Sequence, residues 1–139
     1  MSILEITQET IWKKFTEVAE NFPNNQALLC LGESLTYSEL KEASERLAAS
    51  LHMLGVRKGD KAVLYLVNTP QFIIAWLALQ RLGCVPIPIS PIYTPVDVGY
   101  MVNDSGSETI FCMDTNFGYV VEVFPQTCLK RVITTTLAE

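Results

Sequence analysis

Apolar residues recur every three or four positions in two long stretches of the chain, which is the spacing of one helix face. The first stretch predicts a helix from Thr7 to about Phe22, with an apolar face made of Ile11, Trp12, Phe15, Val18 and Ala19. The second predicts a helix that ends at Gly55, with an apolar face made of Leu40, Ala43, Leu47, Leu51 and Leu54. Glycine at that point is typical of a helix that stops in a left-handed conformation.

Two segments carry the signals of a helix start. Thr36 and Glu39 have the spacing of a capping box, in which each side chain bonds the backbone N–H of the other residue. Thr94 precedes a proline and an acidic residue in the first turn, and this predicts a short helix that runs to about Asp104, with Gly106 beyond it.

A third helix is predicted from Pro70 to Leu82, where Gly83 follows. Its large apolar side chains go all round the axis instead of lining one face: Phe72, Ile73, Ile74, Trp76, Leu77, Leu79 and Leu82. A helix of this kind is buried on all sides. It therefore predicts that layers pack against more than one of its faces.

The strands show a different pattern. Residues 62–67 are apolar without alternation, which is typical of a parallel strand covered on both faces. In Val85–Ile89, Pro86 and Pro88 remove two N–H donors from the same strand edge, so this strand is expected at a sheet edge or fully paired on one side only. Thr109–Met113 has no proline and is expected to be central.

Shorter elements complete an alternation of strand and helix. A strand is predicted at Ala27–Leu31 with a turn at 32–34, a helix at Thr115–Phe124, and a last strand at Leu129–Thr134. This order predicts an α/β fold, a mainly parallel sheet with flanking helices and right-handed crossovers. Residues 1–139 are expected to form a single domain.

Composition argues against several classes of protein. A net charge of −5 without a basic stripe argues against nucleic acid as a partner. The four cysteines form no C-x-x-C pair and there is one histidine, so we expect reduced thiols and neither a zinc site nor a disulfide framework. The N-terminus lacks the pattern of a signal peptide, and no stretch reaches the about 20 apolar residues of a transmembrane helix. A cytoplasmic protein is expected.

No catalytic constellation is visible. The seven glycines form neither GxGxxG nor GxxxxGK[ST], the patterns whose backbone amides bind phosphate groups. His52 lies off its helix's apolar face and is interpreted as a surface residue, and the acidic pairs Glu42 with Glu45 and Asp97 with Asp104 are interpreted as solvated charge. We therefore nominate no catalytic, cofactor-binding or metal-binding residue.

Four stretches resemble, in order and spacing, the N-terminal part of the AMP-forming adenylate enzymes: TYSEL, LGVRKGDKAVLYLVNTPQF, RLGCVPIPISPIYTP and VNDSGSETIFCMD. That superfamily contains acyl-CoA synthetases, nonribosomal peptide adenylation domains and luciferases. The likeness covers roughly Phe22 to Asp114, and the tail after it is most similar to fatty-acyl-CoA ligases. The matched positions are expected to determine the fold: Thr36, Gly55, Gly59, Asp60, Asn68, Pro70, Gly83, Pro86 and Pro91.

The resemblance implies an ATP-dependent, AMP-forming acid–CoA ligase. In this family a carboxylate attacks ATP to give an acyl-adenylate, and the thiol of CoA then takes the acyl group, with Mg²⁺ offsetting phosphate charge. The family's phosphate loop, nucleotide-binding motifs and catalytic lysine have no counterpart here. The chain is therefore expected to be an inactive N-terminal portion, a partial subdomain of the large N-terminal domain. ATP, Mg²⁺, CoA and a fatty acid or other carboxylate would be ligands of the full-length parent.

Two interpretations remain open at this point. In the first, the remainder of the parent enzyme is the partner, and the layer that covers the Pro70–Leu82 helix is absent. An apolar patch is then expected to drive self-association. In the second, the chain is a self-contained α/β binding or interaction module without enzymatic activity, and the likeness reflects a shared fold.

Overall fold

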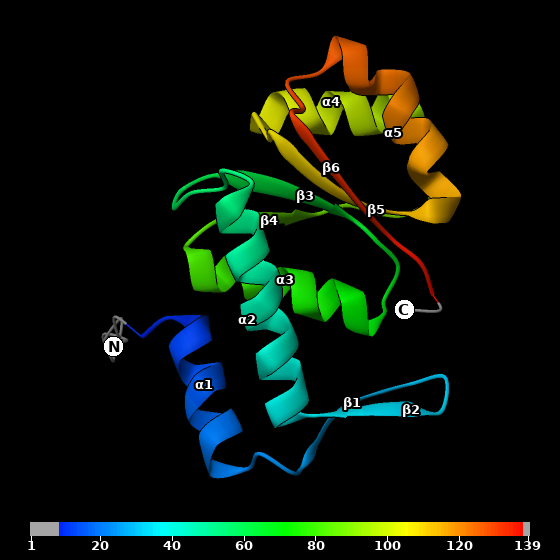
Figure 1. Cartoon of the computed structure of the whole chain (residues 1–139). Coiled ribbons are helices and arrows are strands. Elements are labelled where there is room, and N and C mark those ends of the chain that lie inside the picture. The colour runs from blue at the N-terminus through cyan, green and yellow to red at the C-terminus, as the bar shows by residue number, and fades with distance from the viewer. Residues whose placement is uncertain (1–8, 138–139) are drawn as a thin grey trace, which may run out of the picture.

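The computed structural model describes residues 9–137, which form two sheets and five α-helices (Figure 1). In chain order the elements are α1 (Ile11–Asn21), β1 (Gln26–Cys30), β2 (Glu33–Thr36), α2 (Tyr37–Met53), β3 (Lys61–Tyr65), α3 (Pro70–Leu82), β4 (Val85–Pro88), α4 (Pro95–Ser105), β5 (Thr109–Met113), α5 (Phe117–Val123) and β6 (Arg131–Thr135). Short 3-10 turns at Asp114–Asn116 and Phe124–Gln126 flank α5. The α/β fold class and the parallel sheet with flanking helices are confirmed.

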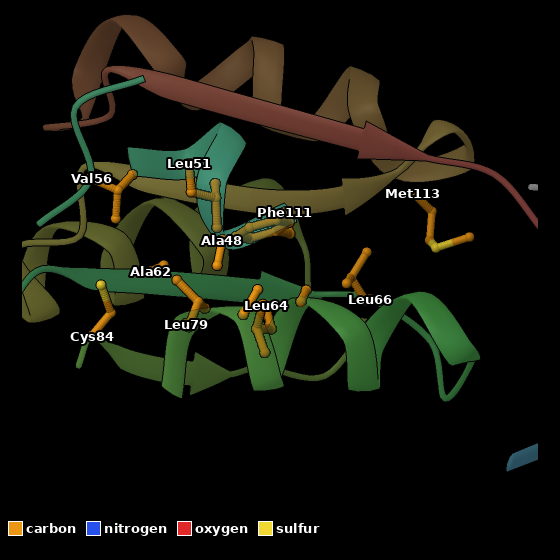
Figure 2. Packing of buried hydrophobic residues seen from close by; sticks show 12 residues of the cluster. Ala48, Leu51, Val56, Ala62, Leu64, Leu66, Leu79, Cys84, Phe111 and Met113 are labelled. Atoms are coloured by element: carbon orange, nitrogen blue, oxygen red, sulfur yellow. The ribbon is translucent and has the colours of Figure 1, made fainter. Parts of the chain in front are cut away.

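The main sheet has four parallel strands in the order β4-β3-β5-β6. Helices α2 and α3 cover one face, and α4 and α5 cover the other (Figure 1). Successive residues of β3 point to opposite faces. Leu64 accordingly packs with Leu51 and Leu79 on the α2–α3 side (Figure 2), while Val63 packs with Val98 on the α4 side. The prediction of a strand covered on both faces is confirmed.

The proline-bearing strand β4 lies at a sheet edge and pairs only with β3 among the strands described. The amides of Val85 and Ile89 donate to the carbonyls of Asp60 and Leu64 on the β3 side, at 2.8 Å and 3.1 Å. Backbone amides alternate in direction along a strand, so Pro86 and Pro88 face the outer edge, where no donor is needed. Strand β5 is paired on both sides, as predicted.

The predicted helix starts and stops are confirmed at α2, α3 and α4. Thr36 and Glu39 form the capping box of α2, and Thr94 and Asp97 form another at α4. Gly83 ends α3 at φ 71°, in the left-handed region that glycine adopts without a steric penalty.

The structure corrects one local prediction and places the start of α1 within the described residues. Residues 33–36, partly predicted as a turn, form β2, which pairs with β1 in an antiparallel hairpin. Helix α1 starts at Ile11 because the Thr10 hydroxyl accepts a bond from the Lys13 amide and caps it. The predicted start at Thr7 lies outside the described residues.

Helix α3 is less uniformly covered than predicted. Leu77 and Leu79 are buried, and the other five large apolar side chains are half-buried. Helix α1 reaches over part of it, with the Arg81 guanidinium 5.2 Å from the centre of the Trp12 ring. Within residues 9–137 none of the seven side chains is fully exposed, so any apolar surface on this helix comes from its half-buried side chains. Exposed apolar side chains lie instead on the hairpin, with Leu29 at 69% and Leu31 at 86% exposure, and on α4 and α5.

Candidate functional site: a groove between the hairpin and helix α3

A cavity of about 830 Å³ lies between the β1–β2 hairpin and the first turns of α2 and α3. Leu28, Leu35 and Ile74 give it apolar walls, and Leu137 also lines it. The cavity exists because β1 and β2 form a sheet of their own, separate from the main sheet. Sequence reasoning missed it because the contributing segments lie far apart in the chain.

The rim of the groove is acidic. Glu33, Glu39 and Glu42 line it, and among the described lining residues only Arg46 is cationic. Arg46 is already paired with Glu42 one helical turn away. The net negative charge of this rim disfavours phosphate and carboxylate groups there.

The Glu39 carboxylate is fixed in its capping role. It accepts hydrogen bonds from the Thr36 amide at 2.8 Å and from the Thr36 hydroxyl at 2.9 Å. These bonds favour the ionised form and hold the pKa of Glu39 below its ordinary value. A carboxylate held ionised in this way is a helix cap and not a general acid.

A second place to look for chemistry is the carboxyl end of β3 and β5. Helix α3 carries the chain from β3 to β4 on one side, and α5 carries it from β5 to β6 on the other, so the connections diverge between these strands. Open α/β sheets bind ligands at such a switch point. The buried Asn116 amide donates to the Tyr65 carbonyl at 3.2 Å, and its Oδ1 has no protein partner within the described residues.

The tyrosine at this point has a structural role. The Tyr65 side chain is fully buried, and its hydroxyl donates to the Tyr93 carbonyl at 2.6 Å. Burial raises the pKa of Tyr65 above its ordinary value, so the phenol stays neutral. The neutral Tyr65 side chain therefore connects β3 to the loop before α4 through this hydrogen bond.

The acidic pairs and the histidine found in the sequence do not form a reactive cluster. Glu45 pairs with Lys41 at 3.2 Å and Arg81 at 2.8 Å, and Asp97 caps α4. His52 is exposed, and its backbone carbonyl accepts a bond from Arg57. Residues 9–137 contain no group of three His, Cys, Asp or Glu side chains that could hold a metal ion.

The positions expected to determine the fold lie at element ends and edges. Gly55, Gly59 and Gly83 have positive φ, and Asp60 accepts the Arg57 amide at 2.8 Å. Other members of the set occupy the cap of α2, the turn before α3, the first position of α3, the β4 edge and the loop after β4: Thr36, Asn68, Pro70, Pro86 and Pro91.

Residues 15–138 match the family of AMP-binding enzymes, and the chain belongs to that family. It is 30% identical over 133 residues to a long-chain-fatty-acid–CoA ligase of Salmonella typhimurium, covering 94% of this chain and 24% of the relative. It is 36% identical over 102 residues to a plipastatin synthase of Bacillus subtilis, covering 73% of this chain and 4% of that protein. The resemblance drawn from the four sequence stretches is confirmed.

The fold agrees with the same family. A long-chain-fatty-acid-CoA ligase from Archaeoglobus fulgidus superposes with a TM-score of 0.89 at 23% identity, covering 95% of this chain and 28% of that one. The chain thus spans about a quarter of the length of these ligases. In the described part of the chain, no helix has the length and apolar character needed to cross a membrane.

Proposed function

We propose that this chain is the N-terminal portion of an ATP-dependent, AMP-forming acid–CoA ligase whose substrate is a fatty acid. The observation that carries the proposal is the match to fatty-acid–CoA ligases along 94% of the chain, including the tail after β5. In the parent, the carboxylate attacks the α-phosphorus of ATP, pyrophosphate leaves, and the CoA thiolate then displaces AMP from the acyl-adenylate.

An amino-acid-adenylating parent is the second candidate. The 36% identity to the plipastatin synthase favours it, but that match stops short of the full chain, at 73%. The two candidates share acyl-adenylate formation and differ in the acid. Pyrophosphate exchange by the full-length parent, with palmitate and a panel of amino acids compared side by side, separates them.

We further propose that the 139-residue chain alone does not form acyl-adenylate. Catalysis of this kind depends on backbone donors and a cation aimed at the transferring phosphoryl group. Neither the groove, with its acidic rim, nor the switch point, with its bonded tyrosine and asparagine, supplies them. ATP, Mg²⁺ and CoA are accordingly assigned to the remainder of the parent, and the parent to the cytoplasm.

The test is ATP–pyrophosphate exchange with and without palmitate, run on the 139-residue chain and on the full-length parent. We expect acid-dependent exchange from the parent and a rate equal to the enzyme-free blank from the chain. Acid-dependent exchange by the chain alone would overturn the assignment of catalysis to the remainder. If the parent shows no pyrophosphate exchange with any acid tried, the result would favour the self-contained binding module.

The isolated chain is also proposed to self-associate through its exposed apolar side chains. The hairpin residue Leu29 supports this, because it is largely exposed and does not line the groove. Sedimentation velocity over a concentration series should show a species larger than the monomer, and the variant Leu29→Ser should shift it back. A monodisperse monomer at all concentrations would contradict self-association.

A further inference from the structure

The last described residue, Leu137, lines the groove between the hairpin and α3. The Gln71 side-chain amide donates to the Thr136 carbonyl at 3.1 Å and holds the chain at the start of α3. Leu137, the last described residue, lines the groove together with Leu28 and Ile74. The chain after β6 therefore reaches the groove at residues 136–137.

We propose that this groove is the docking site of the polypeptide segment that follows Glu139 in the longer parent. The inference rests on the proposed function, since it needs a parent longer than 139 residues. The ligases that match nearly the whole chain are about four times its length, because the chain covers 24% of them. Because Leu137 lines the groove, the later segment of the parent is connected to the chain close to this site.

The walls of the groove define the chemistry of that segment. Its apolar surface requires apolar side chains, because Leu28, Leu35 and Ile74 gain by losing contact with water. The rim carries three carboxylates and one cation, Arg46, so its net negative charge favours lysine or arginine beside those apolar residues. We therefore expect an apolar segment with basic flanks in the reading frame after Glu139.

The hairpin needs such a partner. A two-stranded sheet on its own is marginal in water, and β1 and β2 pair only with each other among the described strands. A segment in the groove would contact β1 through Leu28 and β2 through Leu35 at once. Docking should therefore order the hairpin as well as fill the cavity.

The cysteines offer a direct readout. Cys30 lines the groove and is half-buried, while Cys128 is exposed and lies outside the groove. The experiment measures maleimide labelling of both thiols by mass spectrometry. The 139-residue chain is compared with a chain extended by the next segment of its reading frame. We expect Cys30 labelling to slow by about tenfold in the extended chain, while Cys128 labelling stays the same.

Charge-reversal variants test the rim. In the extended chain, Glu33→Lys with Glu42→Lys should restore Cys30 labelling by about fivefold. The matched control is Glu20→Lys on α1, an exposed carboxylate outside the groove, which should leave the rate unchanged. Circular dichroism of each variant verifies that the helices are intact.

Each other occupant gives a distinct result that would overturn the proposal. Equal Cys30 rates in the two chains mean that the segment does not dock. Slowing that grows with the concentration of the 139-residue chain means that a second copy fills the groove. If palmitate slows Cys30 labelling in the 139-residue chain and the extension does not, the groove is a site for a small ligand. If the parent is active in pyrophosphate exchange but its Cys30 stays reactive, the docking proposal is refuted and the proposed function stands. If Cys30 is protected but the parent is inactive in this exchange, the docking proposal stands and the proposed function is refuted.

Discussion

Strands β1 and β3 have nearly the same kind of sequence and opposite surroundings. β1 and its turn read ALLCL, and β3 with the following residue reads AVLYL, both apolar without alternation. In β3 every one of these side chains is at most 3% exposed. In the hairpin, Leu28, Cys30 and Leu31 line the groove, while Leu29 lies outside it at 69% exposure. The same sequence pattern thus predicts that both faces of each strand are covered. Among the described residues, other elements of the chain cover both faces of β3 but only one face of β1.

The largest contrast between the two regions should appear in core truncations. Leu64→Ala in β3 should cost about 2–5 kcal/mol of unfolding free energy, because a fully buried side chain leaves a cavity. Leu29→Ala in the hairpin should change it by less than about 0.5 kcal/mol. Urea unfolding of the three proteins measures both values. Equal losses would mean that the hairpin face is covered in solution.

Buried thiols should make the main sheet sensitive to alkali. Burial raises the pKa of Cys112 in β5 from 9.0 to about 11, so the folded chain resists losing this proton. The stability is fully present below pH 9 and is lost as the pH rises toward 11, by about 1 kcal/mol at pH 10. Burial also raises the pKa of Cys84 and of Tyr65. Urea unfolding at pH 8 and pH 10 should show a smaller loss in Cys112→Ala than in the unchanged chain. Equal losses of unfolding free energy between pH 8 and pH 10 in Cys112→Ala and in the unchanged chain would contradict this.

The two capping boxes sharpen the comparison, since one caps α2 beside the hairpin and the other caps α4 over the main sheet. Thr36→Ala and Thr94→Ala should each cost about 1 kcal/mol at pH 7. The bonds from Thr36 lower the pKa of Glu39, and those from Thr94 lower the pKa of Asp97. These contributions are present above the ordinary pKa values of 4.5 and 3.8 and are lost as the pH falls. The loss of unfolding free energy in either variant should therefore become smaller in acid. A loss that does not change with pH would show that the carboxylates do not contribute to the caps.

The smallest effect concerns the hairpin turn. Leu31 has φ 51°, a left-handed conformation that costs a leucine free energy. Leu31→Asn should stabilise the chain by about 0.5 kcal/mol, because asparagine tolerates this conformation. Gly32→Ala, at φ 89°, is the matched control and should destabilise the chain. Thermal unfolding of both variants tests the pair, and a destabilised Leu31→Asn would show that the leucine side chain makes contacts that matter.

The elements that sequence analysis placed correctly are those with strong local signals. Helix α3 has proline at its start and a left-handed glycine at its end, and its predicted bounds match the structure. Strand β5 was expected at the centre of the sheet because it contains no proline. The edge position of β4 followed from its two prolines.

What sequence analysis missed depends on contacts between distant segments. Residues 33–36 have no apolar alternation, and their strand conformation comes from pairing with β1. The groove joins β1, β2, α2, α3 and the chain after β6, and no local pattern marks such a cavity. The exposure of Leu29 could not be foreseen either, because an apolar run shows that cover is needed and not whether the same chain provides it.

The prolines of β4 make the two edges of the main sheet different in their hydrogen-bonding capacity. At one edge, Pro86 and Pro88 offer no N–H to an incoming strand. At the other edge, the Arg131 amide turns toward β5, so those of Val132 and Thr134 point outward by alternation. A strand added beside β6 would find both donors and acceptors, whereas one added beside β4 would lack two donors. The two edges of the same sheet therefore differ in how well they can pair with a further strand.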